Sequence, residues 1–338
     1  MKPKIDRNTS IFGASMLLKY VTAMRAEIDG VRQANDIEAI HRMRVASRRL
    51  RTAMTLFADF LPSRKTPIWQ KQLRKTTRSL GAARDTDVQI ETLKDFINEA
   101  PSSQLKTGVR RLLLRWQQKR TKLQNDVNLS VDELVNNNTL DQLQGLLDPL
   151  VQEKEKEFVI THDLFKLAFD SSSNRLDDFL SYEEFVSQPE NIEELHKMRI
   201  AAKWLRYSLE TFAPIYTDEL KNYIQVIREI QDVLGEIHDC DVWVQILPVF
   251  LQHEIKRTVA YYGNTSQVKL LSEGILYFQQ TRQDERNRLY QVYLDEWENW
   301  KKADLWNHLR NLLQTPLEIT AHLYPPSPNN NQFPTDPV

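Results

Sequence analysis

The chain has 338 residues with 45 Lys and Arg against 46 Asp and Glu, and its formal net charge of −1 excludes a generic basic nucleic-acid-binding protein. This length suffices for a large core and about two domain-sized units. A single cysteine, Cys240, excludes an internal disulfide. The N-terminus has no apolar signal segment, and no run approaches transmembrane length, so we expect a soluble, cytoplasmic protein.

Apolar residues recur at spacings of three and four along most of the chain, without clear strand alternation, and only eight glycines occur. This pattern predicts an all-α protein. We expect a helix at residues 16–28, a second from the N-cap Asp36 to about residue 60, and a third from Pro67 to a stop at Gly81. The short connection between the second and third helices predicts an antiparallel hairpin.

The next segment is predicted to begin a new helix after Gly81, with Asp85 or Asp87 as its N-cap. Ser102 or Ser103 would then cap a long helix that carries Arg110, Arg111, Arg115, Lys119, Arg120 and Lys122. The run Asn136-Asn137-Asn138 is the predicted break before the second half of the chain.

In the second half we expect a helix at residues 151–170, a turn at 171–173 and a further helical segment from there to residue 186. The next helix is predicted to begin at Ile192 and to end at a turn around Pro214, and its antiparallel partner to continue from that turn to Gly235. Two further helices are predicted at residues 247–261 and 265–300. Prolines and asparagines without an apolar period predict a disordered tail at 315–338.

The predicted second helix carries a stripe of basic residues opposite its apolar face. Its spacings of three, four and three place the members within about 80° of one another, at about 100° per residue. This first basic stripe consists of His41, Arg44, Arg48 and Arg51. On the following helix the residues that share one side are Lys71, Arg74, Lys75 and Arg78.

Positive charge is concentrated around this stripe. Residues 41–84 contain twelve Lys and Arg and one acid, Asp59, which gives this segment +11 and leaves −12 for the rest of the chain. A solvated helix face would normally carry balancing acids at i+3 or i+4. The segregation therefore indicates a specific anionic partner.

The pattern occurs twice. A second basic stripe of His196, Arg199, Lys203 and Arg206 has the same spacings, 155 positions after the first. The pair Leu234-Gly235 follows Leu80-Gly81 at 154 positions, and so does His238-Asp239-Cys240-Asp241 relative to Arg84-Asp85-Thr86-Asp87. A repeat at a near-constant offset over several elements predicts two structurally similar halves.

On these motifs the sequence resembles the CHAD family, the conserved histidine α-helical domain. The matching segments are HRMRVASRRLR at 41–51, LG at 80–81 with RDTDV at 84–88, the stripe from His196 to Tyr207, and LG at 234–235 with HDCDV at 238–242. The resemblance covers residues 10–310. It implies two pseudo-symmetric bundles of about four helices each, at 10–150 and 151–310, packed around a basic central groove or pore. It also implies binding of inorganic polyphosphate and association with polyphosphate granules.

The predicted polyphosphate-binding residues of the first half are His41, Arg44, Arg48, Arg49, Arg51, Lys71, Arg74, Lys75 and Arg78. Those of the second half are His196, Arg199, Lys203, Arg206 and Arg228. Two departures from the family pattern make the halves unequal: Trp204 stands where a basic residue is usual, and Gln225, Glu229 and Asp232 replace cations of the first half. The first half is therefore predicted to dominate binding.

The histidines and aspartates allow other interpretations. His41 and His196 either donate to phosphate or hydrogen-bond a neighbouring helix. The paired aspartates Asp85, Asp87, Asp239 and Asp241 suit helix capping or pairing with arginines better than acid/base chemistry. No Gly-rich phosphate loop, nucleophile elbow or H-E-x-x-H motif occurs, so no enzyme activity, metal site or cofactor is predicted.

Two other functions stay open. One is a metal-dependent phosphohydrolase that uses the aspartate pairs, and the other is an adaptor for nucleic acid or an acidic protein. Nucleic acid is disfavoured because its grooves usually interleave basic residues with exposed aromatic rings, whereas these stripes are almost purely basic. No membrane partner is expected.

Overall fold

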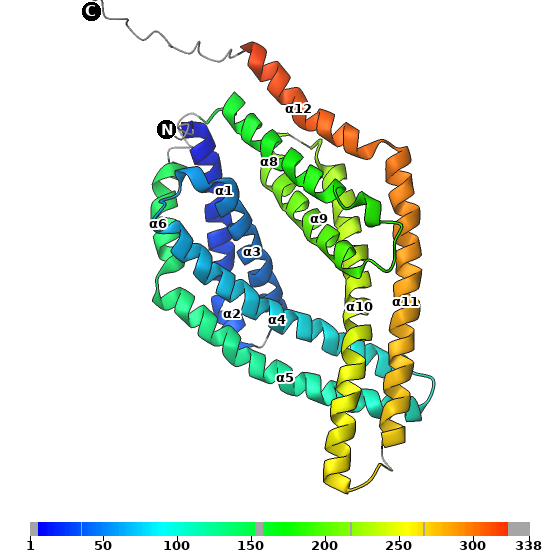
Figure 1. Ribbon diagram of the computed structural model, residues 1–338. Coiled ribbons are helices and arrows are strands. Elements are labelled where there is room, and N and C mark those ends of the chain that lie inside the picture. The colour runs from blue at the N-terminus through cyan, green and yellow to red at the C-terminus, as the bar shows by residue number, and fades with distance from the viewer. Residues whose placement is uncertain (1–5, 35, 153–157, 217, 266–267, 324–338) are drawn as a thin grey trace, which may run out of the picture.

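The computed structural model describes residues 6–34, 36–152, 158–216, 218–265 and 268–323 (Figure 1). Within these ranges all regular secondary structure consists of α-helices and short 3₁₀ turns, and no strand occurs. The all-α prediction is confirmed. None of the described helices is long and apolar enough to cross a membrane.

The helices of the first half are α1 (Arg7–Ala26), α2 (Ile28–Gln33), α3 (Ile37–Leu56), α4 (Thr66–Glu99), α5 (Ser103–Asn136) and α6 (Thr139–Gln152). Those of the second half are α8 (His162–Leu180), α9 (Ile192–Phe212), α10 (Lys221–Tyr262), α11 (Val268–Lys302) and α12 (Leu305–Leu323). Short 3₁₀ turns follow α3 (Ala58–Phe60), α8 (Glu183–Phe185) and α9 (Ala213–Ile215).

Several predicted helix ends are confirmed. The Asp36 side chain accepts a hydrogen bond from the Glu38 backbone N–H at 2.8 Å, and Ser102 accepts one from Leu105 at 3.4 Å. Each side chain satisfies a donor that the first turn of a helix leaves unpaired. The break after α5 lies in the asparagine run, where Asn138 has a left-handed φ of 51°.

The predicted helix stops at Gly81 and Gly235 are wrong. Both glycines lie inside long helices, α4 and α10, and neither has the positive φ that ends a helix at a glycine. Asp85 and Asp87 are consequently not N-caps. Residues 247–261, predicted as a separate helix, continue α10 without a break. Both helices continue past the glycine because apolar side chains in their later turns are buried, among them Leu93 of α4 and Leu247 of α10.

Three other predictions in the second half need correction. No single helix covers residues 151–170, because α6 ends at Gln152 and α8 begins at His162, with no helix at the described residues 158–161. The serine run predicted as a turn lies inside α8, where the Ser172 hydroxyl forms a buried hydrogen bond with Ser208 of α9 at 3.1 Å. The predicted tail from residue 315 begins too early, because α12 continues through Pro316 to Leu323. Residues 324–338 lie outside the described residues.

Buried apolar side chains form one main cluster that includes both halves of the chain. The rings of Phe12 in α1 and Phe212 in α9 stack with centroids 6.2 Å apart and planes 8° apart. The boundaries of two separate bundles therefore stay a prediction, while the packing of α1, α3, α8 and α9 around common apolar contacts is established.

A second, smaller apolar cluster joins the far ends of the long hairpins α4–α5 and α10–α11 (Figure 1). There α5 and α11 cross at two glycines. A Cβ on Gly108 would lie 2.1 Å from the Leu271 carbonyl oxygen, and one on Gly274 would lie 2.0 Å from that of Leu105. Only glycine allows the two backbones to approach this closely.

The hairpins also repeat a buried ion pair. Arg120 of α5 donates to Asp87 of α4 at 2.6 Å, and Arg286 of α11 donates to Asp241 of α10 at 2.9 Å. In each hairpin one glycine lies in the first helix and another at the crossing of α5 and α11. These two glycines are 27 positions apart in the first hairpin (Gly81 and Gly108) and 39 positions apart in the second (Gly235 and Gly274). The α10–α11 hairpin is therefore twelve residues longer than its counterpart.

Candidate anion-binding site

The two basic stripes come together between the halves of the molecule. The first lies on α3 and the second on α9, and these helices contact each other. Lys203 of α9 lies within the electrostatic field of Arg48, Arg44 and Arg51 of α3 as well as of Arg199 on its own helix. Desolvation and then the charge of Arg74 on α4 lower the pKa of Arg51, so these two side chains also lie near each other.

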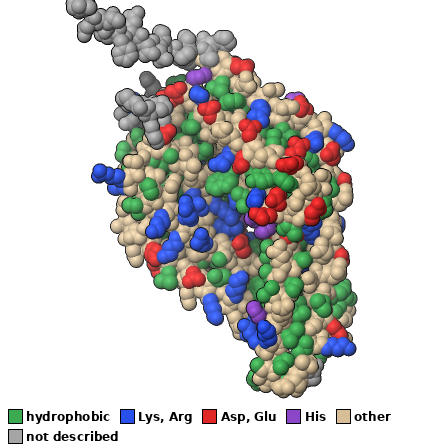
Figure 2. Space-filling model, viewed as in Figure 1, with side chains coloured by type: hydrophobic (Ala, Val, Ile, Leu, Met, Phe, Trp, Pro, Cys, Tyr) green, Lys and Arg blue, Asp and Glu red, His purple; other side chains and the backbone are tan. Residues whose placement is uncertain are grey.

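These six residues are called the central cation cluster here: Arg44, Arg48, Arg51, Arg74, Arg199 and Lys203. Lys and Arg side chains gather in the middle of the face seen in Figure 2. The sequence places members of the cluster up to 159 positions apart, so folding and not local sequence creates this density of charge.

The cluster members raise one another's electrostatic energy. Desolvation, followed by the charge of Arg48 and the other arginines, lowers the pKa of Lys203 to about 7. Desolvation and then Arg48 lower the pKa of Arg44 to about 10. The charged forms are thus disfavoured in the free protein, and an anion placed among them would relieve this cost.

Few acids compensate the cluster. Arg44 Nη2 donates to Asp85 of α4 at 3.0 Å. Across the rest of the cluster, no Asp or Glu within the described ranges forms an ion pair with a member. Desolvation and the charge of Asp85 raise the pKa of Asp239, while Arg199 and Arg44 lower it, so this second acid lies in the same neighbourhood. Six cations with two nearby carboxylates leave a surplus of about four positive charges.

Five buried nitrogen atoms in the two basic stripes have no hydrogen-bond partner among the described residues. They are Nδ1 of His41, Nδ1 of His196, Nε of Arg44, Nε of Arg199 and Nε of Arg206. Buried donors and acceptors are nearly always paired, with protein, water or a ligand. The first four of these atoms occupy equivalent positions in the two halves, which indicates a candidate site that receives polar groups from outside the chain.

Gly81 and Gly235 allow two of these arginines to lie against neighbouring helices. A Cβ on Gly81 would be 3.7 Å from Arg44 Nε, and one on Gly235 would be 3.5 Å from Arg199 Nε. A methyl group would fit at these distances, but a longer side chain would occupy the space of the guanidinium. These glycines therefore belong to the site and do not end helices.

The histidines lie at the ends of the stripes. The rings of His196 and His238 have centroids 4.1 Å apart, and desolvation followed by His196 and Arg199 lowers the pKa of His238 to about 4. Desolvation and then Arg84 lower the pKa of His41. Across the described part of the chain, no group of three or more His, Cys, Asp or Glu side chains could hold a metal ion.

His238 and Arg84 were not among the predicted site residues. Both occupy the same position of the repeat, 154 positions apart, and each lies next to the histidine that begins a stripe. The repeat in the sequence could have identified them, because residues at equivalent positions have equivalent neighbours even when their side chains differ.

Three predicted residues are engaged elsewhere. Arg49 Nη2 donates to Glu210 of α9 at 2.8 Å, and Arg206 Nε lies 3.9 Å from the other oxygen of the same carboxylate. Lys75 Nζ donates to Glu133 of α5 at 2.6 Å. Arg49 thus links α3 to α9 across the two halves, Arg206 lies near Glu210 on its own helix, and Lys75 links α4 to α5.

The remaining predicted residues lie on exposed faces of α4 and α10. Lys71 and Arg78 are exposed on α4, and within the described residues neither makes an ion pair. Arg228 is exposed on α10, where its Nη1 donates to Gln225 on the same helix at 3.1 Å.

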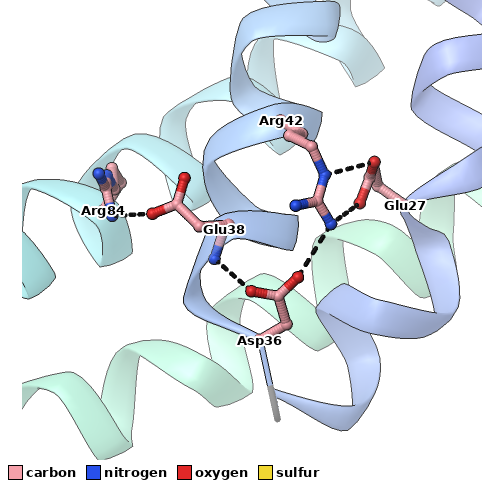
Figure 3. A network of polar contacts seen from close by, with 5 residues as sticks. All are labelled: Glu27, Asp36, Glu38, Arg42 and Arg84. Carbon is pink, nitrogen blue, oxygen red and sulfur yellow. Dashed lines mark hydrogen bonds and ion pairs between the residues drawn. The ribbon is translucent and has the colours of Figure 1, made fainter.

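Arg42, which interrupts the first stripe in sequence, points toward Glu27 and Asp36, whereas Glu38 and Arg84 lie on the other side of α3 (Figure 3). Its guanidinium donates to both carboxylate oxygens of Glu27, at 2.7 and 2.8 Å, and to Asp36 at 2.9 Å. Arg84 of α4 donates to Glu38 at 3.3 Å. These contacts fix the start of α3 and hence the direction of the stripe.

The chain matches the CHAD domain family over residues 15–248. This protein belongs to the CHAD family. The crystal structure of the CHAD domain from the plant Ricinus communis superimposes with a TM-score of 0.58 at 20% identity, over 87% of this chain and 94% of that one. PptA from Streptomyces chartreusis superimposes with a TM-score of 0.54 at 12% identity, over 85% of this chain and 99% of that one. At these identities the likeness concerns the fold of this CHAD protein. No curated protein matches its sequence.

Proposed function

We propose that this CHAD protein binds inorganic polyphosphate, without catalysis, at a groove lined by the central cation cluster. The observation that carries the proposal is the convergence of Lys203 with four arginines from two halves of the chain, against only two nearby carboxylates. Membership of the CHAD family favours a binding module over a catalyst. Binding to polyphosphate granules in the cytoplasm would follow from the same site.

A linear polyanion suits the shape of the stripes. From His41 to Arg51 the first stripe spans about 15 Å at about 1.5 Å per residue, which is long enough for several consecutive phosphates. Arginine side chains bind phosphate oxygens bidentately, and the unpaired Nε atoms of Arg44 and Arg199 are available as further donors.

Aromatic side chains beside the cluster favour polyphosphate over single-stranded nucleic acid. Tyr207 is buried, with Arg206 5.3 Å from its ring centroid, and Trp204 is covered by Arg175 at 5.6 Å. Tyr207 therefore offers no open face on which a base would stack, and the partly buried Trp204 has one face occupied by Arg175 of α8.

The phosphohydrolase hypothesis receives no support from the aspartates. Asp87 and Asp241 are buried in ion pairs with arginines of α5 and α11, and Asp85 accepts from Arg44. Asp239 forms no ion pair within the described residues and lies near Asp85, but these two carboxylates have no third His, Cys, Asp or Glu ligand in the described part of the chain.

A competition experiment tests the proposal. Long polyphosphate, tripolyphosphate and single-stranded DNA are compared at matched phosphate concentration and at two salt concentrations. We expect tight, steeply salt-dependent binding that increases with polyphosphate chain length, and weaker binding of DNA. Arg48→Glu with Arg74→Glu should abolish binding at unchanged helical content. Equal affinity for tripolyphosphate and long chains would contradict the groove, and unchanged binding by the double variant would place the site elsewhere.

A further inference from the structure

α5 carries a second concentration of positive charge outside the central cation cluster. Residues 103–125 contain seven Lys and Arg and no Asp or Glu. Four of them fall within about 80° of one another on the helix and span about 16 Å. This α5 stripe consists of Arg111, Arg115, Lys119 and Lys122, of which all but the half-buried Arg115 are exposed.

One end of the α5 stripe is fixed by a buried acid from α10. Arg111 Nε and Arg115 Nε each donate to Glu254 at 3.0 Å, Arg257 bonds the same carboxylate, and Glu254 itself is fully buried. Burial alone would raise the pKa of Glu254, but the three arginines lower it, so the carboxylate stays ionised. Three guanidinium groups on one carboxylate leave two positive charges uncompensated.

The geometry of these bonds leaves the arginines available. The contacts to Glu254 use Nε of Arg111 and Arg115, which orients both guanidinium groups. Arg115 Nη1 donates to Gln118 at 3.1 Å, so Nη2 of Arg115 and both Nη atoms of Arg111 are left for another acceptor. The side chains of Arg111 and Arg257 are 42% and 57% exposed. An arginine held by a buried carboxylate loses less conformational entropy when it binds a phosphate.

Glu254 belongs to the part of the long hairpin that has no counterpart in the first half. At the repeat offset of 154 it corresponds to Ala100, the C-cap residue that follows the last residue of α4. The longer α10 therefore supplies both Glu254 and Arg257 to a stripe on α5. This makes the arrangement a specific feature of the second hairpin and not a consequence of the repeat.

The α5 stripe begins where the central cation cluster ends. α4 and α5 run antiparallel, with Lys75 bonded to Glu133 and Asp87 bonded to Arg120. By this register, Asp85, which accepts a hydrogen bond from Arg44, lies at about the same height along the α4–α5 hairpin as Lys122 and Lys119. Lys and Arg side chains continue from the middle of the face in Figure 2 toward its lower part.

We propose that the α5 stripe, together with Arg257, is a second phosphate-binding surface that holds the part of a long polyphosphate chain extending beyond the central cation cluster. This inference rests on the proposed function. A purely structural role explains Arg111 and Arg115, which link α5 to α10. It leaves Lys119 and Lys122 unexplained, because within the described residues neither forms an ion pair with an acid; Lys119 lies over the Trp116 ring at 5.5 Å.

The test uses Lys119→Gln with Lys122→Gln in the full chain, because this pair leaves the Glu254 contacts intact. Dissociation constants are measured for tripolyphosphate and for long-chain polyphosphate at several salt concentrations. We expect affinity for the long chain to fall about tenfold and its salt dependence to become shallower by about one to two units of slope, with tripolyphosphate binding unchanged. A variant with Lys166→Gln and Lys301→Gln removes the same charge from α8 and α11 and should bind like the wild type.

A second variant, Arg111→Gln with Arg115→Gln, tests the anchored end. A structural role alone would lower the melting temperature and leave the ratio of long-chain to short-chain affinity unchanged, which would overturn the inference for these arginines. If the wild type binds long chains tightly and the lysine variant binds them equally well, the α5 stripe is not a binding surface. A wild type that binds neither ligand would instead overturn the proposed function itself.

Discussion

Arg44 of α3 donates a hydrogen bond to Asp85 of α4 at 3.0 Å, one turn beyond the glycine against which its Nε lies. The contact between arginine and glycine recurs in the second half, where Arg199 lies against Gly235. In both halves a small residue in the middle of a long helix thus determines where an arginine of the neighbouring helix is placed.

Replacement of Gly81 should separate the effect of space from the effect of helix propensity. Gly81→Ala fits, because its Cβ would be 3.7 Å from the nearest atom, and it should stabilise α4 by up to about 1 kcal/mol. Gly81→Leu should displace the Arg44 guanidinium and weaken polyphosphate binding severalfold. Titration with polyphosphate and chemical unfolding measure the two effects.

Gly145→Leu on α6 is the matched control, because nothing lies within 4 Å of a Cβ there. It should leave binding unchanged. If Gly81→Leu binds as tightly as Gly81→Ala, the position of Arg44 does not matter for the site.

Much of the site followed from helical periodicity. Spacings of three and four placed Arg44, Arg48 and Arg51 on one face, and the repeat did the same for Arg199 and Lys203. The two functions of glycine could not be separated in this way. A glycine ends a helix when its φ is positive and lets a side chain approach when its φ is helical, and packing decides between them.

The environment of Lys203 was also beyond the reach of sequence reasoning. Its spacing to Arg199 is local, but the arginines of α3 that disfavour its charge are about 150 to 160 positions away. The same holds for Arg49 and Arg206, which share Glu210 only because α3 and α9 meet. Basic residues with the same spacing thus have two different environments: most members of the central cation cluster have no acidic partner, whereas Arg49 and Arg206 share Glu210.

Lys203 should make polyphosphate binding depend on pH. Desolvation and the surrounding arginines place its pKa at about 7 in the free protein, and bound phosphate should raise it, so binding takes up a proton. Affinity should therefore increase as the pH falls toward about 7. Lys203→Arg stays charged and should bind more tightly above pH 8 with a flatter pH profile; calorimetry in buffers of different ionisation enthalpy measures the proton uptake.

The lowered pKa of Lys203 should also make the free energy of unfolding of the free protein depend on pH. An unfolded lysine has a pKa of about 10.4, so between about pH 7 and 10 the unfolded chain binds more protons than the folded one. The contribution of Lys203 to the free energy of unfolding thus becomes more favourable as the pH rises through this window. The same pH dependence in Lys203→Met would contradict this assignment.

The buried pair of Asp241 and Arg286 should be required for stability. Both side chains are less than 8% exposed, and Asp241→Ala would leave the arginine charge buried without its partner. We expect a loss of about 3–5 kcal/mol in the free energy of unfolding, measured with denaturant. Asp170→Ala, which breaks the exposed pair with Lys166, should cost at most about 1 kcal/mol. Equal losses in the two variants would contradict the structural role of the buried pair.

The crossing of α5 and α11 should not tolerate even a methyl group. Gly108→Ala and Gly274→Ala would each place a Cβ about 2 Å from a backbone carbonyl oxygen, which cannot rotate away. Overpacking of this kind costs about 1–3 kcal/mol or more, measurable as a lower denaturation midpoint. Gly145→Ala, in open space on α6, should be neutral or stabilising. A stabilised Gly108→Ala would show that the helices separate easily.

The halves should contribute unequally to binding, because α10 lacks the cations of α4. The positions of Lys75 and Arg78 are occupied by Glu229 and Asp232, both exposed, and Glu229 accepts from Gln225 at 2.9 Å. These acids should repel a polyanion from the second half. Arg74→Glu should therefore weaken polyphosphate binding more than Arg228→Glu at the equivalent position.

The reverse change should improve binding. Glu229→Lys with Asp232→Arg restores the charges of α4 on α10 and should tighten long-chain binding about tenfold while steepening its salt dependence, because two further phosphate contacts become available. Asp170→Lys with Glu296→Lys adds comparable charge on α8 and α11, and separates this local effect from net charge. If both variants tighten binding equally, long-range attraction explains the gain. If only the α10 variant does so, the acids on α10 weaken the contribution of the second half to binding.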